Sequence, residues 1–214
     1  MHNFIVCGWY TPDYRHYWTK LQQQLVEIGA PHDFCECPKG AGGWEANTRR
    51  KPAQILAALD RNPDKVVIFI DVDCAIPGGL TGLTELASIP SDVAFYLRSG
   101  RRRTGTPRFN PRTGTMVFQP TQRARAFVEQ WYAASSAAPR YSNDQEILPI
   151  VLGKVPGLSV TFVDVRFCAL PGDKCPAPVI LHDRSRQART FKRLFKLFGR
   201  TTWAMSQLGR QAAR

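Results

Sequence analysis

The chain alternates strand-like runs with segments in which apolar residues recur at helical spacing. Three runs in the first third predict strands, at residues 4–7, 33–37 and 66–70. Helical spacing predicts two helices between them, one over residues 14–28 and one through Ile55, Leu56 and Leu59. Strands that alternate with helices in this way predict a parallel, doubly wound sheet whose ligands gather at the carboxyl ends of the strands.

The second half of the chain shows a different pattern, with irregular loops between shorter elements. Four further strands are predicted near residues 93–97, 115–118, 160–163 and 179–181. Two further helices are predicted over residues 122–135 and 144–152. The whole therefore predicts an α/β protein with a mixed, mostly parallel sheet flanked by helices.

Composition and charge divide the chain into a body and a tail. With 214 residues, 43% of them hydrophobic, the chain can bury a full core. Lys and Arg number 29 against 17 Asp and Glu, but residues 184–214 hold nine basic residues and no acidic one. The tail thus carries +9 and residues 1–183 only +3, which predicts one folded domain over 1–183 and a separate basic tail over 184–214.

The tail places Phe191, Leu194, Phe195 and Phe198 at helical spacing between basic residues. This pattern is typical of a cationic amphipathic helix on an anionic membrane surface, so residues 185–214 predict a peripheral contact with the inner leaflet. Binding of a nucleic acid is the competing interpretation, since a basic chain with aromatics also suits a phosphate backbone. We favour the membrane because the charge is confined to the tail and the chain shows no recognisable nucleic-acid module. No stretch reaches ~18 apolar residues and the start lacks a signal-peptide pattern, so we expect a cytoplasmic protein.

Two carboxylates follow the most apolar strand, in the stretch VVIFIDVDCAI. Alternation along an extended chain places Asp71 and Asp73 on the same side, where their oxygens suit Mg²⁺ or Mn²⁺. A solvated turn is the simplest alternative. A second is a phosphohydrolase of the haloacid dehalogenase type, but Ala75 stands where that class has Thr or Val, and no Asp pair follows downstream.

Several segments in order resemble the nucleotide-diphospho-sugar transferases of the GT-A fold, in particular their retaining branch. They are FIVCGWYTPDY, RRKPAQILAAL, IFIDVDCAI, RTGTMVFQPT, NDQEIL and VILHDRS, and they span residues 3–186. The resemblance implies a Rossmann-like GT-A domain followed by the basic amphipathic helix. It also implies a metal-dependent glycosyltransferase that moves a hexose-like sugar from a nucleotide-diphosphate sugar to a hydroxyl of a glycan or lipid-linked acceptor.

The matching positions imply a metal site. Asp71, Asp73 and His182 would bind Mn²⁺ or Mg²⁺, and Asp71 would also meet the donor ribose. A neutral imidazole is itself a suitable ligand for Mn²⁺, although a surface or capping histidine is the plain alternative for His182. Lys51 would neutralise the diphosphate, and a solvated helix face is its alternative.

The remaining implied contacts surround the sugar nucleotide. Tyr10 and Thr11 would meet the base and ribose, although core packing of Trp9 or Tyr10 is an equal alternative. Thr113 with Gly114 would approach the sugar. Asp144 and Gln145 would contact the transferred sugar or the acceptor, while a charge at a helix N-terminus explains Asp144 equally well. Arg112 departs from the pattern, because Asn or Ser is common at that position in the family.

Two other features complete the sequence-based picture. The arginine-rich segment 98–112 has no acidic residue and predicts a flexible loop that binds an anionic acceptor or closes over phosphates. The six cysteines form no CxxC pair, which favours buried reduced thiols over a zinc site or a disulfide framework. Cys35 and Cys37 alternate along one predicted strand and should share a face.

Overall fold

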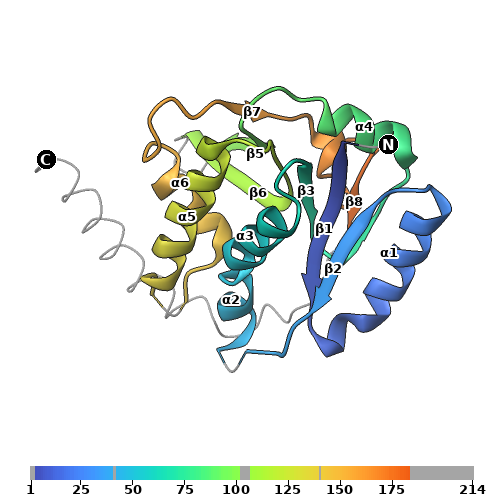
Figure 1. The fold of residues 1–214 in the computed structure, drawn as a ribbon, viewed down its shortest axis with the longest axis horizontal. Coiled ribbons are helices and arrows are strands. Elements are labelled where there is room, and N and C mark those ends of the chain that lie inside the picture. Colours follow the sequence, from blue (N-terminus) through green and yellow to red (C-terminus); the bar gives the residue numbers. More distant parts are fainter. Residues whose placement is uncertain (1–2, 41, 102–106, 140, 184–214) are drawn as a thin grey trace, which may run out of the picture.

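A computed structural model describes residues 3–40, 42–101, 107–139 and 141–183. Its centre is a six-stranded sheet in the order β2-β1-β3-β6-β5-β7 (Figure 1). The strands are β1 Phe4–Tyr10, β2 His32–Glu36, β3 Val66–Ile70, β5 Val93–Arg101, β6 Pro107–Phe118 and β7 Val160–Phe162. Three of the neighbouring pairs are parallel, and only β6 runs against both of its neighbours. The prediction of a mixed, mostly parallel sheet is confirmed.

One face of the sheet is covered by α1 and α4, which span Arg15–Glu27 and Gly79–Ala87 (Figure 1). Leu21 and Leu25 of α1 and Leu83 and Leu86 of α4 are fully buried there. They pack against the side chains that β1 and β3 direct to this face, Phe4 among them. The alternation of strand side chains between faces places their neighbours in the chain on the other side.

The other face is covered by α3, α5 and α6, which span Lys51–Arg61, Gln122–Ser136 and Asp144–Val151. Ile55, Phe127, Trp131 and Ile147 are completely buried in this second core. Because helices bury both faces, the central strands are apolar throughout, as the five consecutive buried residues of β3 show. A central strand of this kind ends abruptly where the chain turns polar, at Asp71.

A second, two-stranded sheet lies beside the carboxyl end of β3. It pairs β4, Cys74–Ala75, antiparallel with β8, Leu181–His182. The backbone N–H of Asp183 donates to the carbonyl of Asp73 at 2.7 Å, which extends this pairing to the acidic segment. The late strand therefore reaches the acidic segment through a sheet of its own, and the predicted strand at 179–181 begins two residues later than expected.

Other elements also differ from the sequence-based prediction. β1 continues to Tyr10, three residues past the predicted end, because its last residues pair with β2. Between β2 and α3, where the sequence pattern predicts no helix, the chain forms α2, Gly43–Thr48. α4 was not predicted either, because its short run GLTGLTELA begins at Gly79 directly after Gly78 and so lacks an evident start. Short helices of this kind are stabilised by packing rather than by their own propensity.

The prediction of a flexible arginine loop over 98–112 is wrong for the described part of that segment. β5 extends to Arg101 and β6 starts at Pro107, and the two strands pair along this stretch. Arg112 is buried, and its guanidinium donates to the carboxylate of Asp173 at 2.7 Å and to the carbonyl of Cys168 at 2.9 Å. Arg112 therefore stabilises the segment around Cys168, and its guanidinium is buried rather than solvated.

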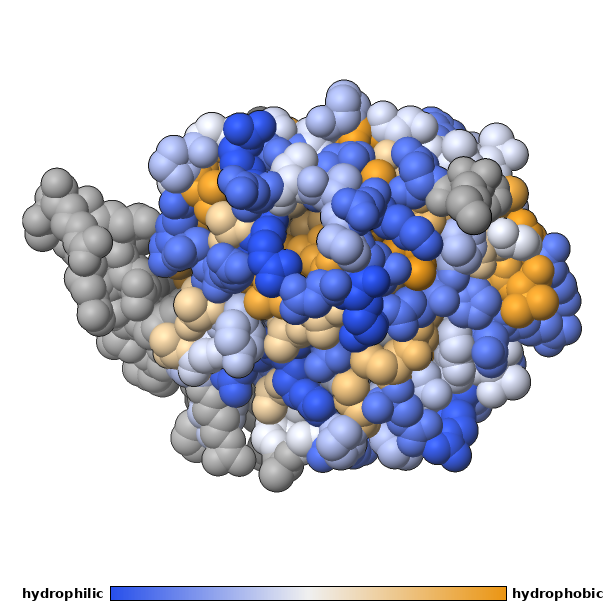
Figure 2. Space-filling model, in the orientation of Figure 1, coloured by the Kyte–Doolittle hydropathy of each residue, from blue (hydrophilic) through white to orange (hydrophobic). Residues whose placement is uncertain are grey.

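The predicted amphipathic tail, residues 184–214, lies outside the described residues. Among the described residues no helix is long and apolar enough to cross a bilayer. On the face shown in Figure 2, the coloured hydrophobic residues form separate small patches between hydrophilic ones.

Candidate functional site

A cleft of about 210 Å³ opens at the carboxyl ends of β1 and β3. Its walls come from the end of β1, the 3-10 turn Pro12–Tyr14, α2, the start of α3, the acidic segment after β3 and the start of α6. Seven of the residues predicted from the sequence line it: Tyr10, Thr11, Lys51, Asp71, Asp73, Asp144 and Gln145. Thr113, Gly114 and His182 are buried directly behind this wall and do not line the cleft. Segments far apart in the chain thus meet where an α/β sheet places its ligands.

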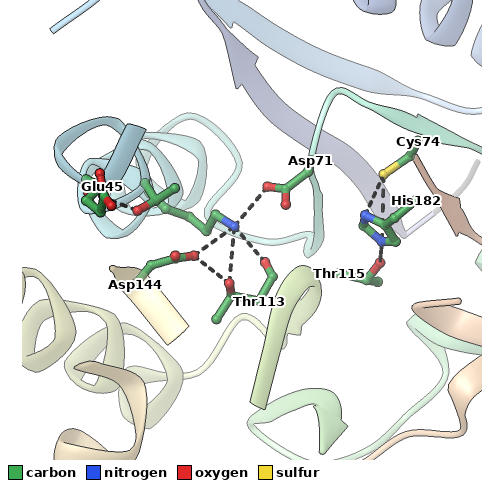
Figure 3. A network of polar contacts seen from close by, with 9 residues as sticks. Glu45, Asp71, Cys74, Thr113, Thr115, Asp144 and His182 are labelled. Carbon is green, nitrogen blue, oxygen red and sulfur yellow. Dashed lines mark hydrogen bonds and ion pairs between the residues drawn. The ribbon is translucent and has the colours of Figure 1, made fainter. Parts of the chain in front are cut away.

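Lys51 is the centre of a buried polar network. Its ammonium lies 2.8 Å from Oδ1 of Asp71 and 3.0 Å from Oδ2 of Asp144. It also donates to the backbone carbonyl of Thr113 at 2.9 Å, and the Thr113 hydroxyl donates to Asp144. Figure 3 shows Asp71, Asp144 and Thr113 arranged around this common centre. One lysine therefore holds two carboxylates from distant elements at the base of the cleft.

Burial sets the charge states in this network. Burial opposes the positive charge of Lys51, but the carboxylates of Asp144 and Asp71 outweigh it and raise the lysine pKa above its usual value. Desolvation raises the pKa of Asp71, and the ammonium of Lys51 opposes that rise. The Asp71 side chain keeps 37% of its surface exposed toward the cleft, whereas that of Asp144 keeps 3%. Asp144 is therefore the more tightly held of the two acids.

Asp73 has no cationic partner within ion-pair distance among the described residues. Burial and the neighbouring charge of Asp71 raise its pKa from 3.8 to about 7. The residues that line the cleft include four carboxylates and two ammonium groups, so the ionised cleft is net negative. Of these, Asp13 and Lys39 pair with each other at the rim, 2.7 Å apart. A surplus of two negative charges in a confined space favours a bound cation.

His182 lies beside the acidic segment in a second group of polar side chains, separate from the lysine network in Figure 3. Its Nδ1 is 3.1 Å from the sulfur of Cys74, the residue directly opposite it in the β4–β8 pair. Its Nε2 is 2.8 Å from the hydroxyl of Thr115 on β6. Burial, with the charges of Lys51 and Arg112, lowers the pKa of His182 to about 3, so the ring is neutral. A neutral ring fixed through one nitrogen leaves the other available as a metal ligand.

Gly114 makes room for His182 against the sheet. A Cβ at this position would lie 2.6 Å from Cε1 and 2.9 Å from Nδ1 of His182, and 3.2 Å from Oδ2 of Asp71. Any side chain here would displace the imidazole. Glycine is therefore required because it has no side chain, and not because of its backbone conformation. Its carbonyl accepts from the N–H of Asp71 at 2.8 Å, which fixes where the acidic segment starts.

Aromatic side chains also line the cleft, namely Trp9, Tyr10, Tyr14 and Trp44. The ring of Tyr10 stacks on that of Trp18, with centroids 5.6 Å apart, and Trp18 stacks in turn on Phe34 at 4.5 Å. Trp44 of α2 also lines the cleft and is 37% exposed. Rings held rigid in this way present flat surfaces for a planar or apolar ligand.

The start of α6 places Asp144 and Gln145. Asn143 accepts from the N–H of Glu146, and the Glu146 side chain accepts from the N–H of Asn143, which forms a capping box. Asp144 is the first residue of α6, so it is the acidic charge at a helix N-terminus that the sequence suggested. Its carboxylate also bonds to Lys51 and Thr113 and so belongs to the buried network.

The sequence did not point to three features of the site. Cys74 lies beside His182, although the cysteine spacing favoured inert thiols; its place directly after Asp73 on an extended chain was the available signal. Trp44 reaches the cleft only because α2 forms. Thr115 was predicted as a strand residue and not as the partner that orients His182.

Comparison with solved structures gives the fold. The chain superposes on a glycosyltransferase involved in the glycosylation of the major capsid of PBCV-1 with a TM-score of 0.63 and 15% identity, over 87% of this chain and 94% of that one. The glycosyltransferase GlyE of Streptococcus pneumoniae TIGR4 gives 0.58 and 14%, over 97% and 61%. The galactosyltransferase LgtC, solved with donor and acceptor sugar analogs, gives 0.53 and 12%, over 96% of each chain. No known family model and no curated protein matches the sequence. The chain has the fold of GT-A glycosyltransferases, as the sequence motifs predicted.

Proposed function

We propose that the protein is a glycosyltransferase that transfers a sugar from a nucleotide-diphosphate sugar to an acceptor hydroxyl with the help of a divalent cation. The observation that carries the proposal is the cleft itself, which is lined both by Asp71, Asp73 and Asp144 and by aromatic side chains. A diphosphate would be repelled by this net negative cleft unless a cation came with it. The GT-A fold of the chain supports the same activity, since the solved structures that share it are glycosyltransferases.

The residues present fit a divalent cation. Asp71, Asp73 and His182 would hold Mn²⁺ or Mg²⁺, because they combine carboxylate oxygens with a neutral imidazole at the end of β3. When bound, such a cation stabilises the negative charge that develops on the departing diphosphate. Oδ2 of Asp71 is directed to the Gly114 and His182 side, while its Oδ1 bonds to Lys51. The carboxylate can thus serve both partners.

The protein groups around the cation would orient the sugar and the acceptor. Lys51 has its ammonium hydrogens engaged by Asp71, Asp144 and Thr113, which favours an orienting role over direct contact with the diphosphate. Asp144 and Gln145 face the cleft from α6, where the acceptor hydroxyl and the transferred sugar would meet them. Tyr10 and Thr11 would hold the base and ribose at the end of β1.

Thr113 supports this arrangement from behind the wall. Its side chain is fully buried and its oxygens bond to Lys51 and Asp144, so it positions these two groups rather than touching the sugar. The acceptor we propose is a glycan or lipid-linked sugar, and the basic tail would bring the protein to an anionic membrane surface on which such an acceptor lies.

The test is release of nucleoside diphosphate from a panel of nucleotide sugars, with Mn²⁺ or Mg²⁺, by the full chain. We expect release from at least one donor, and its loss in Asp73→Ala and Asp144→Asn. Asp33→Asn is the matched control, because Asp33 forms its ion pair with Arg61 outside the cleft. Absence of release with every donor, or release that survives Asp73→Ala, would contradict the proposal. Steady phosphate release from phosphomonoesters would favour the phosphohydrolase instead.

A further inference from the structure

Cys74 stands in the acidic segment with its sulfur directed at the proposed cation site. The sulfur, a carboxylate oxygen of Asp73 and a ring nitrogen of His182 all lie within 4.8 Å of one another. Cys74 and His182 are opposed residues of the β4–β8 pair, so the backbone of two strands fixes their separation. This cluster brings together three ligand types on a short, rigid frame.

His182 lies between two polar neighbours. Its Nε2 is 2.8 Å from Thr115 Oγ1, and the sulfur of Cys74 is 3.1 Å from Nδ1 and 3.7 Å from Nε2. These two distances place the sulfur beside the ring and off the line of the Nδ1 lone pair, so the imidazole has to turn about its Cβ–Cγ bond for one cation to bond to both residues. In a tetrahedral zinc site, bond lengths of about 2.3 Å to sulfur and about 2.0 Å to nitrogen separate the two ligand atoms by about 3.5 Å. The observed separation differs from that value by only a few tenths of an ångström.

We propose that Cys74 is a protein ligand of the cation, together with Asp73 and His182, and that its sulfur shifts the site toward thiophilic cations such as Zn²⁺ and Co²⁺. On binding, a cation–sulfur bond replaces the S–H bond and the thiol proton passes to solvent. A soft thiolate favours borderline cations over hard ones such as Mg²⁺. Three of the ligands then come from this cluster, and the fourth tetrahedral position is left for Asp71 or for the substrate.

The inference deepens the proposed function, because it rests on the same cation site beside the diphosphate. Binding of a cation by Asp73, Cys74 and His182 can nevertheless be measured without any nucleotide. A buried cysteine hydrogen-bonded to a histidine, with no part in cation binding, is the competing explanation of the same geometry.

The absorption spectrum of bound Co²⁺ distinguishes a Cys74 that binds the cation from a Cys74 that is only hydrogen-bonded to His182. The full chain, freed of metal with a chelator, is titrated with Co²⁺ while the near-ultraviolet sulfur-to-cobalt charge-transfer band is recorded. We expect a band that saturates at one equivalent, is lost in Cys74→Ser and is abolished by added Zn²⁺. Cys37→Ser is the matched control, since Cys37 is also half-buried and its sulfur lies 3.8 Å from that of Cys35. The band should persist in this variant.

Selectivity gives a second readout. Competition between Zn²⁺ and Mn²⁺, followed by the paramagnetic signal of free Mn²⁺, should show the preference for Zn²⁺ falling at least about tenfold in Cys74→Ser, the smallest loss typical of even an outer-shell partner. A band that survives Cys74→Ser, or an unchanged preference, would overturn the proposal.

If Cys74→Ser fails to fold, the wild-type protein is sufficient to test the inference. Bound Co²⁺ without a charge-transfer band would overturn it. Failure of the proposed function is distinguishable, since a cobalt–sulfur band without release of nucleoside diphosphate from any donor would keep the cation site and reject the transferase. Release of nucleoside diphosphate without a cobalt–sulfur band would keep the transferase and reject Cys74 as a ligand of the cation.

Discussion

Removal of the Lys51 charge is the perturbation from which the structure predicts the largest change. Lys51→Met keeps the length of the side chain but leaves Asp71 and Asp144 without their shared ammonium. At 3.0 Å and an effective dielectric constant of about 20, the attraction between Lys51 and Asp144 alone is about 5 to 6 kcal/mol. Desolvation of the buried lysine offsets part of it, and solvent in the cleft screens the half-exposed Asp71. A net loss of about 3 to 5 kcal/mol is typical when one partner of a buried pair is removed.

We therefore expect Lys51→Met to lower the free energy of unfolding by about 3 to 5 kcal/mol at pH 8, as measured by urea denaturation. The loss should shrink at pH 5, because burial raises the pKa of Asp71 and removal of the Lys51 ammonium takes away the charge that opposes this rise, so Asp71 is protonated more readily. The double variant Lys51→Met/Asp144→Asn should lose less free energy of unfolding than the two single variants lose together, by at least about 1 kcal/mol.

Lys39→Met is the matched control. Lys39 pairs with Asp13 at 2.7 Å, but 61% of the lysine side chain is exposed, so its loss should leave the free energy of unfolding nearly unchanged. A Lys51→Met variant that is as stable as Lys39→Met, or a double variant whose losses are additive, would refute the reasoning.

Three further changes test other parts of the site and fold. Gly114→Ala should push His182 from its place and cost about 1 to 3 kcal/mol in urea denaturation, since its Cβ would lie 2.6 Å from the imidazole. Asp92→Ala should cost about 3 kcal/mol or more in the same assay, because the carboxylate of Asp92 bonds to Ser159, to the N-cap residue Thr121 and to Arg123. Asp73→Asn should stabilise the metal-free protein progressively as the pH rises from about 4 to about 7, as followed by its melting temperature in a chelator.

The sign for Asp73 follows from its raised pKa. The folded state holds the proton up to pH about 7 while the unfolded chain loses it near 3.8, so wild-type stability falls across that window and an asparagine avoids the loss. A difference between wild type and Asp73→Asn that does not change with pH would contradict this. Gly153→Ala is the control for Gly114→Ala, because a Cβ at Gly153 meets no atom within 4 Å. Asp60→Ala, which breaks only an exposed pair with Arg125, is the control for Asp92→Ala.

The strong periodic elements of the chain were predictable because burial on both faces of the sheet makes their patterns unambiguous. The run of five buried residues in β3 is an example, and so is the long α5. α2 and α4 were missed because each is short and preceded by glycines, so tertiary packing rather than local sequence stabilises it. The arginine segment was misinterpreted because composition does not distinguish a solvated loop from a paired hairpin.

For the site, residue type and strand-end position sufficed to select groups that the fold brings together. Asp71, Asp73 and Asp144 meet in one cleft as the order of motifs suggested. What the sequence could not predict is which groups pair. The engagement of Lys51 with two carboxylates, and of His182 with Cys74, depends on how helices and strands far apart in the chain pack together.

Binding of a nucleoside diphosphate to the cleft through a cation at Asp73 is the central claim, and a thermal shift measures it most directly. The melting temperature of the full chain is recorded with UDP, GDP or CMP, each with and without Mn²⁺. At a nucleotide concentration of 100 times the dissociation constant, binding adds about 2.7 kcal/mol of stability, which is easily resolved. We predict a rise for at least one nucleoside diphosphate that requires Mn²⁺ and disappears in Asp73→Ala. A metal-dependent rise that persists in Asp73→Ala, or no rise with any nucleotide, would contradict the claim.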